Sequence, residues 1–377
     1  MKIIVLGLSL SSSWGNGHAT TYRGLLRELS LRGHEVHFLE RDVPWYADNR
    51  DLVELPGVHL HFYTSLDELE HRHLPDIRDA DAVIVGSYVP DGFDVGNLVL
   101  EHATGVTAFY DIDTPITLAA LRRGKTDYLS PDQIARYRVY LSFTGGPTLQ
   151  ELERRWHSPA ARPLYCAVDP HAYYQEPAVE VSWDLGYLGT YSVDRQPSLE
   201  RLLLEPARRS RGRRFIVAGP QYPSSIAWPA NVQRVEHLPP AQHRHFYNCQ
   251  RFTLNLTRAD MIAAGWSPSV RLFEAAACGT PIISDYWPGL ENFFTPGHEI
   301  LLAHSENEVD RILRDLSPSA AAEIGRAAQR RVLAQHTAAH RAMELEAYLM
   351  EASNHPIRSR AAIAQTLFVS PHLSSAT

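Results

Sequence analysis

Short apolar runs alternate with amphipathic stretches along almost the whole chain, in two consecutive series. In the first amphipathic stretch, Tyr22, Leu25, Leu26 and Leu29 fall at helical spacing, and Gly33 follows as a helix end. The strand-like runs are short and apolar and end in polar or glycine residues, as buried parallel strands do. In the first series they cover residues 2–8, 35–40, 81–87, 106–113, 139–146 and 163–170.

The second series begins after a polar, proline-bearing stretch. Its strand-like runs cover residues 184–190, 214–220, 231–237, 252–257, 281–286 and 299–303, and its last helix-like stretch runs from 318 to 350. A chain of 377 residues is long enough for two domains of roughly 100–200 residues each. We therefore predict an N-terminal domain over 1–170, a linker over 171–183, a second domain over 184–336, and a C-terminal helix and tail over 337–377 that return toward the first domain.

Two such series predict an α/β fold with two doubly wound parallel sheets that face each other across a cleft. Ligands of these sheets bind beyond the carboxyl ends of the strands. The loops that directly follow the predicted strands are therefore the places where we look for chemistry.

Composition argues against several classes of protein. The formal net charge of -7 disfavours a protein that coats nucleic acid or an acidic membrane, so we expect no nucleic-acid partner. No apolar run approaches the roughly 20 residues that span a bilayer, and the N-terminus lacks a signal-peptide pattern, so we expect a cytoplasmic protein. Cys166, Cys249 and Cys278 form no CxxC pair, which favours buried core thiols over disulfides or structural zinc.

The loop after the first strand-like run contains Gly15, Gly17 and His18. A dinucleotide-binding GxGxxG turn would need a third glycine where Thr20 stands, and no phosphate-binding P-loop motif occurs in the chain. A nicotinamide-dependent dehydrogenase is therefore disfavoured. Gly15 and Gly17 still permit positive φ and a close approach of ligand to backbone, so both are candidate binding residues.

His18 stands at the start of the predicted helix, where the helix dipole disfavours its protonation. A neutral imidazole that faces a cleft can accept a proton, which makes His18 a candidate catalytic base; the alternative is a packing or capping residue. We expect Thr20 and Thr21 to cap the same helix. A base of this kind benefits from a carboxylate, and either Asp111 or Asp113, at the end of another strand-like run, can provide it.

Two further patterns suggest metal ligands only weakly. Asp111 and Asp113 form a DxD pattern, but any two aspartates one residue apart match it, and we predict no metal site. The His-Arg-His triplets at 71–73 and 243–245 lack further ligands at metal spacing, so we expect surface histidines there.

The second series contains loop residues suited to a diphosphate. The helix that begins near Ser269 offers free amides and a positive dipole end, and Arg271 in its first turn adds charge. Glu274, one turn later, can accept both hydroxyls of a ribose. The alternatives are ion pairs for Arg258 and Arg271 and an ordinary turn before Arg195. The candidate binding residues of this half are Gly189, Thr190, Arg195, Tyr222, His237, Arg258, Ser267, Ser269, Arg271 and Glu274.

Residues 279–302, with RLFEAAACG before them and a long helix after them, resemble the CgeB-like family of GT-B glycosyltransferases. This resemblance covers roughly residues 185–350, and the stretch GNGHATTYRGLLRELSLRGHEVHFLE resembles the acceptor domain of GT-B enzymes generally. The resemblance implies two facing Rossmann-like domains. It places the nucleotide of an activated sugar on the second domain and the acceptor on the first, usually without a metal.

The resemblance also implies transfer of a sugar from a nucleoside diphosphate to a hydroxyl of a small molecule, glycan or protein, without a cofactor. Glu274 matches the ribose-binding glutamate that ends the E-x7-E motif, whereas Trp266 stands where the first glutamate belongs, a departure that weighs against a retaining mechanism. His18 matches the base of inverting members, with Asp111 or Asp113 as its partner. A nucleotide-sugar epimerase and a non-catalytic sugar-nucleotide-binding protein remain alternatives. The donor sugar, the acceptor and the oligomeric state stay open.

Overall fold

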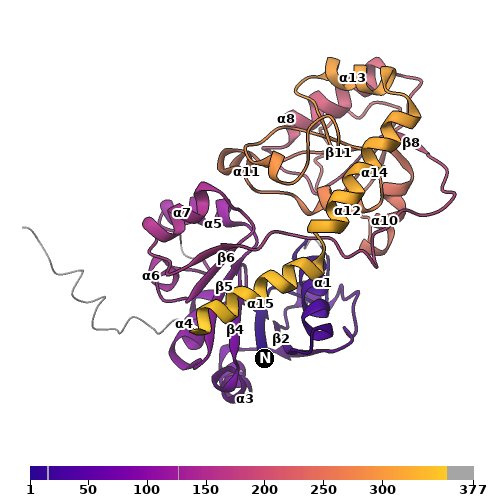
Figure 1. The fold of residues 1–377 in the computed structure, drawn as a ribbon. Helices are drawn as coiled ribbons and strands as arrows, with labels where there is room; N and C mark the ends of the chain where they lie inside the picture. The colour runs from indigo at the N-terminus through magenta and orange to yellow at the C-terminus, as the bar shows by residue number, and fades with distance from the viewer. Residues whose placement is uncertain (15–16, 126, 355–377) are drawn as a thin grey trace, which may run out of the picture.

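Two parallel β-sheets organise the chain into two lobes (Figure 1). The structure, a computed structural model, describes residues 1–14, 17–125 and 127–354. In these residues the first sheet has the strand order β3-β2-β1-β4-β5-β6-β7 and the second β10-β9-β8-β11-β12-β13. The paired strands run parallel, and each sheet reverses its strand order at a central strand, β1 or β8. This is the doubly wound arrangement that the sequence predicts.

We call the part built on the first sheet the N-lobe. Its strands are β1 (Lys2–Gly7), β2 (Glu35–Arg41), β3 (Val58–Tyr63), β4 (Ala82–Gly86), β5 (Val106–Asp111), β6 (Val139–Ser142) and β7 (Ala161–Pro163). Its helices are α1 (His18–Leu31), α2 (Pro44–Ala47), α3 (Leu66–Asp79), α4 (Gly92–His102), α5 (Thr114–Arg122), α6 (Pro131–Ile134) and α7 (Pro147–Arg154).

The part built on the second sheet is the C-lobe. Its strands are β8 (Trp183–Leu188), β9 (Phe215–Ala218), β10 (Val232–Val235), β11 (Gln250–Asn255), β12 (Ile282–Ser284) and β13 (Leu301–Leu302). Its helices are α8 (Gln196–Leu199), the π-helical η1 (Glu200–Leu204), α9 (Glu205–Arg209), α10 (Pro240–Asn248), α11 (Ala259–Ala264), α12 (Val270–Ala277), the 3₁₀ turn η2 (Leu290–Asn292), α13 (Glu306–Asp315) and α14 (Pro318–Gln335).

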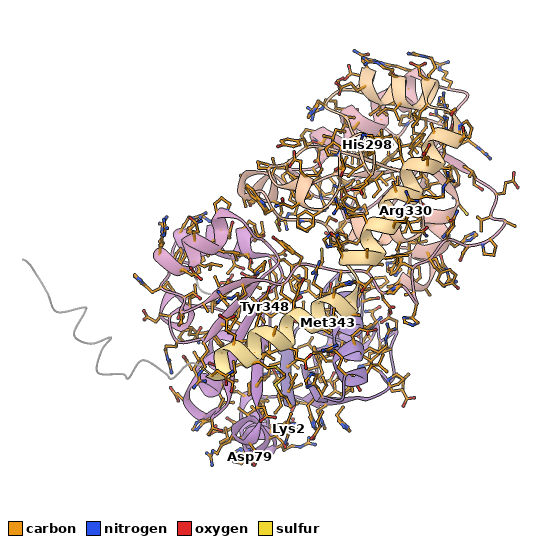
Figure 2. The ribbon with its side chains drawn as sticks, viewed as in Figure 1. Lys2, Asp79, His298, Arg330, Met343 and Tyr348 are labelled. Carbon is orange, nitrogen blue, oxygen red and sulfur yellow. The ribbon has the colours of Figure 1, made fainter. Side chains whose placement is uncertain are left out.

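The last described helix, α15 (Ala338–Asn354), returns to the N-lobe and packs against α1, β5 and β6. Figure 2 shows Met343 and Tyr348 of α15 beside the N-lobe, whereas Arg330 of α14 lies in the C-lobe. Between α14 and α15, Thr337 pairs with Val168 in an isolated β-bridge. The two chain segments that join the lobes therefore run side by side at this point.

The three cysteines are buried and free, as the sequence analysis expects. Burial raises the pKa of the Cys166 thiol to about 12, and it also raises the pKa of Cys249 and of Cys278. Buried thiols with raised pKa values are poor nucleophiles. Among the described residues, no helix combines the length and the apolarity needed to cross a membrane.

The edge strand β3 was not predicted, and one histidine expected at the surface is buried. β3 has the sequence VHLHFY and lies at the sheet edge, so it lacks the all-apolar pattern of the central strands. His73, on α3, is only 6% exposed, so the prediction of a surface residue there is wrong. Its ring packs 5.5 Å from that of His61, on β3. Burial lowers the pKa of both histidines.

Candidate active site between the lobes

The serine-rich loop after β1 is held by a single buried carboxylate, that of Glu40 on β2. Leu10 and Ser11 donate their amides to Glu40 Oε2 at 2.7 and 2.9 Å. The hydroxyls of Ser9 and Ser11 donate to Oε1 at 2.8 and 2.6 Å. Hydrogen bonds to a charged group contribute about 1.5–3 kcal/mol each, so this loop is firmly positioned despite its length. Sequence reasoning missed Glu40, because an acid at a strand end does not reveal which loop it binds.

The end of this loop meets the C-lobe. The ring of Trp14 lies 4.3 Å from the ring of His237, which follows β10. Burial lowers the pKa of His237. His237 was predicted to bind nucleotide, and the structure places it at the contact between the lobes.

His18 is the first residue of α1, as predicted, and Gly17 is the N-cap. The predicted capping by Thr20 and Thr21 is wrong, because the helix begins before them; Thr20 Oγ1 instead donates back to the Gly17 carbonyl at 3.1 Å. Gly17 has φ of -68°, so it makes no use of the positive φ that was expected to justify a glycine there. Gly15 lies outside the described residues. Burial lowers the pKa of His18, which favours the neutral imidazole that a base requires.

The structure distinguishes the two candidate aspartates. Asp113 acts on His18 electrostatically and partly offsets the lowering of the His18 pKa. Asp111 is fully buried; it accepts hydrogen bonds from the hydroxyls of Tyr140 and Thr117, and burial raises its pKa to about 6. Asp113 is therefore the better partner for His18. The carboxylate of Asp111 instead holds the Tyr140 and Thr117 side chains.

Tyr88, which sequence reasoning missed, connects His18 to Asp113. Its ring lies 5.5 Å from the His18 ring, and its hydroxyl donates to Asp113 Oδ2 at 3.1 Å. Tyr88 has φ of +63°, a left-handed conformation that costs a bulky residue about 1–3 kcal/mol. Its position in the loop after β4, two residues beyond the strand, is the only sequence signal that could have found it.

We expect Asp113→Asn to lower the pKa of His18. The substitution removes the negative charge that raises this pKa but leaves the burial that lowers it. NMR titration of the His18 ring resonances measures the shift without any substrate. The His18 pKa in Asp111→Asn should change less, because the Asp111 carboxylate is bonded elsewhere. An unchanged His18 pKa in Asp113→Asn would contradict the assignment.

In the C-lobe, Arg271 on α12 joins the ends of two strands. Its guanidinium donates to the carbonyl of Leu188, at the end of β8, and at 3.0 Å to Asn255 Oδ1, at the end of β11. It is only 8% exposed, and among the described residues it forms no ion pair, so the ion-pair alternative does not hold there. Gly189, next to Leu188, gives this guanidinium room, since a Cβ there would lie 2.9 Å from Arg271 Nη2.

Arg195 and Arg258 lie on neighbouring loops of the same edge. Arg195 Nη2 donates to the Thr190 carbonyl at 2.7 Å, and the Tyr222 hydroxyl donates to Gly189 O at 3.0 Å. The two loops are joined where the Ala259 amide donates to Asp194 Oδ2 at 2.9 Å. Neither arginine forms an ion pair in the described part of the chain, and the buried Nε of each has no hydrogen-bond partner there. These two guanidinium groups therefore keep their positive charges uncompensated.

Ser267, Ser269 and Glu274 surround the start of α12. Ser269 is the N-cap but makes no capping hydrogen bond through its side chain. The Ser267 hydroxyl lies 2.9 Å from that of Thr144, in the N-lobe, so it joins the two lobes. Glu274 is 4% exposed and accepts a hydrogen bond from the Tyr247 hydroxyl at 3.1 Å.

Trp266, at the position of the missing first glutamate, is wedged between the lobes. Its carbonyl accepts the Gly145 amide at 3.0 Å, and its own φ is +43°. A Cβ on Gly146 in the N-lobe, or on Gly289 in the C-lobe, would lie 2.5 Å from the Trp266 indole. The indole therefore fits only because both neighbours are glycines.

Gly146→Ala should destabilise the contact between the lobes. Gly146 has φ of +57° and ψ of -138°, a sparsely populated conformation that costs alanine about 1–3 kcal/mol, and the new Cβ overlaps the indole. Gly124→Ala is the control for a positive φ alone, since it has φ of +72° but no heavy atom within 4 Å of the added Cβ. We expect a lower Tm and a larger radius of gyration in X-ray scattering for Gly146→Ala than for Gly124→Ala. If the two variants have equal Tm and equal radius of gyration, Trp266 does not hold the lobes together as described.

The chain is similar to known proteins both in the sequence of its second half and in its overall fold. Residues 195–347, which cover most of the C-lobe, match a family described as glycosyl transferase-like. A search of curated protein sequences gives no match. Solved structures match nearly the whole chain. Sucrose-phosphate synthase from Thermosynechococcus elongatus aligns with a TM-score of 0.60 and 15% identity, over 98% of this chain and 99% of that one.

Two further solved structures have similar coverage. HepE from Anabaena, in complex with UDP and glucose, aligns with a TM-score of 0.69 and 12% identity, over 93% of this chain and 100% of that one. An alpha-glucosyltransferase in complex with UDP and a 13-mer DNA aligns with a TM-score of 0.68 and 12% identity, over 92% and 99%. The chain therefore has the GT-B fold of glycosyltransferases, and its second lobe carries a glycosyl transferase-like domain.

Proposed function

We propose that the protein is a CgeB-like, metal-independent glycosyltransferase that moves a sugar from a nucleoside diphosphate to an acceptor hydroxyl with inversion. The solved structures with UDP, or with UDP and glucose, have the same fold and support this substrate class. The observation that carries the proposal is the pair of uncompensated guanidinium groups of Arg195 and Arg258, which lie at the strand ends of the glycosyl transferase-like domain.

The C-lobe residues act on the leaving group. Arg195, Arg258 and the first amides of α12 are the groups that receive the diphosphate, whose negative charge grows as the bond to the sugar breaks. In this proposal they neutralise that charge in place of a metal ion. Arg271 holds the strand ends and hence the loops that carry them.

The N-lobe residues act on the acceptor. His18 takes the proton of the acceptor hydroxyl while the acceptor oxygen bonds to the anomeric carbon and the bond from that carbon to the diphosphate breaks. The products are the glycosylated acceptor, the nucleoside diphosphate and a protonated His18. Asp113 stabilises the imidazolium, and Tyr88 keeps both groups in place.

A thermal-shift panel of UDP-, GDP-, dTDP- and ADP-sugars tests the proposal. A ligand that binds only the folded protein stabilises it by mass action and so raises Tm. At a ligand concentration of a hundred times Kd, the stabilisation is about 2.7 kcal/mol. We expect a saturable shift with one nucleotide, smaller in Arg195→Ala and Arg258→Ala. Absence of a shift with all four would contradict the proposed function.

A further inference from the structure

A pocket with a volume of about 270 Å³ lies between the lobes, on the side of α5 and α7. Its walls are α5 and α7 of the N-lobe and α11 of the C-lobe, and Figure 1 shows α11 facing these two helices. A water molecule occupies roughly 30 Å³ in the liquid, so the pocket has room for about nine waters or one small organic molecule.

Each wall continues directly from a loop of the candidate active site. Helix α5 begins at Thr114, the residue after Asp113, and α11 begins at the residue after Arg258. Helix α7 follows Gly146, which touches the Trp266 wedge. The lining residues Pro115 and Asp260 each stand two residues beyond a proposed site residue, Asp113 and Arg258 respectively, and neither proposed site residue lines the pocket itself.

The walls are mostly apolar. Pro115, Leu118 and Ala119 come from α5, and Ala263 and Ala264 come from α11. Apolar walls with a few placed polar groups are typical of sites for small organic ligands. They suit a ligand with an apolar face or substituent.

The charged lining residues disfavour an anion. The Arg122 guanidinium donates to both carboxylate oxygens of Glu151 at 2.6 Å, so its charge is already compensated. Asp260 on the opposite wall is exposed and, among the described residues, belongs to no ion pair. A negatively charged ligand would meet an uncompensated carboxylate and lose its hydration without a cation in return.

From this pocket we infer the acceptor class: an uncharged, hydroxyl-bearing molecule with an apolar portion, bound between α5, α7 and α11. The inference rests on the proposed function, because it takes the pocket to be the acceptor side of a glycosyl transfer site. The apolar portion packs on α5 and α11, and the hydroxyl lies at the end of the pocket lined by Pro115, two residues after Asp113.

Binding of p-nitrophenyl β-D-glucoside and of p-nitrophenyl β-D-glucuronide tests the inference. It is measured by calorimetry in the presence of the nucleoside diphosphate that the thermal-shift panel identifies. The two probes differ only by a carboxylate in place of a hydroxymethyl group. We expect saturable binding of the glucoside and binding of the glucuronide weaker by about tenfold or more. Asp260→Lys should remove or reverse this preference.

Ala263→Trp fills the pocket from α11 and should weaken glucoside binding by about tenfold or more. Ala334→Trp is the matched control, because Ala334 is also an exposed alanine but lies on α14, away from the pocket. Absence of saturable glucoside binding, equal binding of the glucuronide, or unchanged binding in Ala263→Trp would overturn the inference. The affinities for UDP, GDP, dTDP and ADP alone are measured on the same variants; if the wild type binds none of the four, the proposed function fails, whatever the outcome with the glucoside.

Discussion

Replacement of His18 by alanine is expected to lower kcat by about 10²–10⁴-fold while nucleotide binding is retained, because a positioned base contributes an effect of this size. His18 begins α1, and Tyr88 and Asp113 beside it belong to the N-lobe, whereas the residues proposed to bind the diphosphate belong to the C-lobe. Turnover is measured with the nucleotide sugar that the thermal-shift panel identifies, and binding with the corresponding nucleoside diphosphate.

The pH profile gives the same prediction a second readout. Burial lowers the pKa of His18 from its ordinary value of 6.5, so the neutral, active form persists at pH 7 and is lost only as the pH falls through the lowered pKa. The rate should therefore be level near neutral pH and decline on the acid side. His298→Ala is the matched control, since His298 is exposed and lies in the C-lobe (Figure 2). Near-normal turnover in His18→Ala would end the assignment of His18 as base.

The two-sheet fold could be predicted from the sequence because its strands are buried on both faces. Strands such as β1 and β4 are apolar along almost their whole length, and this pattern can be read from the strand's own residues without knowing which strands lie beside it. β3 was not predicted because an edge strand tolerates polar residues. Its histidines at 59 and 61 interrupt the apolar run by which the other strands were recognised. The start of α1 at His18 was correct, but its cap was not, since capping depends on the backbone of one residue, Gly17.

Position after a strand correctly placed His18, Arg195 and Arg258 at the carboxyl ends of the sheets, while their roles stay predictions. It could not show which of Asp111 and Asp113 lies near His18. β5 ends at Asp111, and the chain leaves the extended conformation before Asp113, so the alternation of a strand no longer predicts where the second carboxylate points. The contacts of Tyr88 and Glu40 could not be predicted from the sequence for a different reason. Their roles arise from partners 25 or more residues away, and no local pattern encodes those contacts.

The sequence predicts that Glu274 binds the ribose of the nucleotide. It is buried, and it accepts the hydroxyl of Tyr247, so a purely structural role is a real alternative. The hydroxyl of Tyr173 also hydrogen-bonds to Glu274. An ionised carboxylate has about four acceptor positions, so the two tyrosines leave two for the hydroxyls of a ribose. If Glu274 binds a ribose, its charge contributes to nucleotide affinity; if it is structural, its charge contributes only to stability.

Glu274→Gln is therefore expected to weaken UDP binding by about 10–100-fold, since hydrogen bonds to a charged group contribute about 1.5–3 kcal/mol. The same variant should bind 2′,3′-dideoxy-UDP, which lacks both ribose hydroxyls, no more weakly than the wild type does. Tyr247→Phe is the control: it removes the donor to Glu274 and should lower Tm while UDP affinity stays unchanged. Calorimetry provides the affinities and thermal unfolding the stabilities. A lower Tm with unchanged UDP affinity in Glu274→Gln would assign Glu274 to the core and remove the ribose contact from the proposed site.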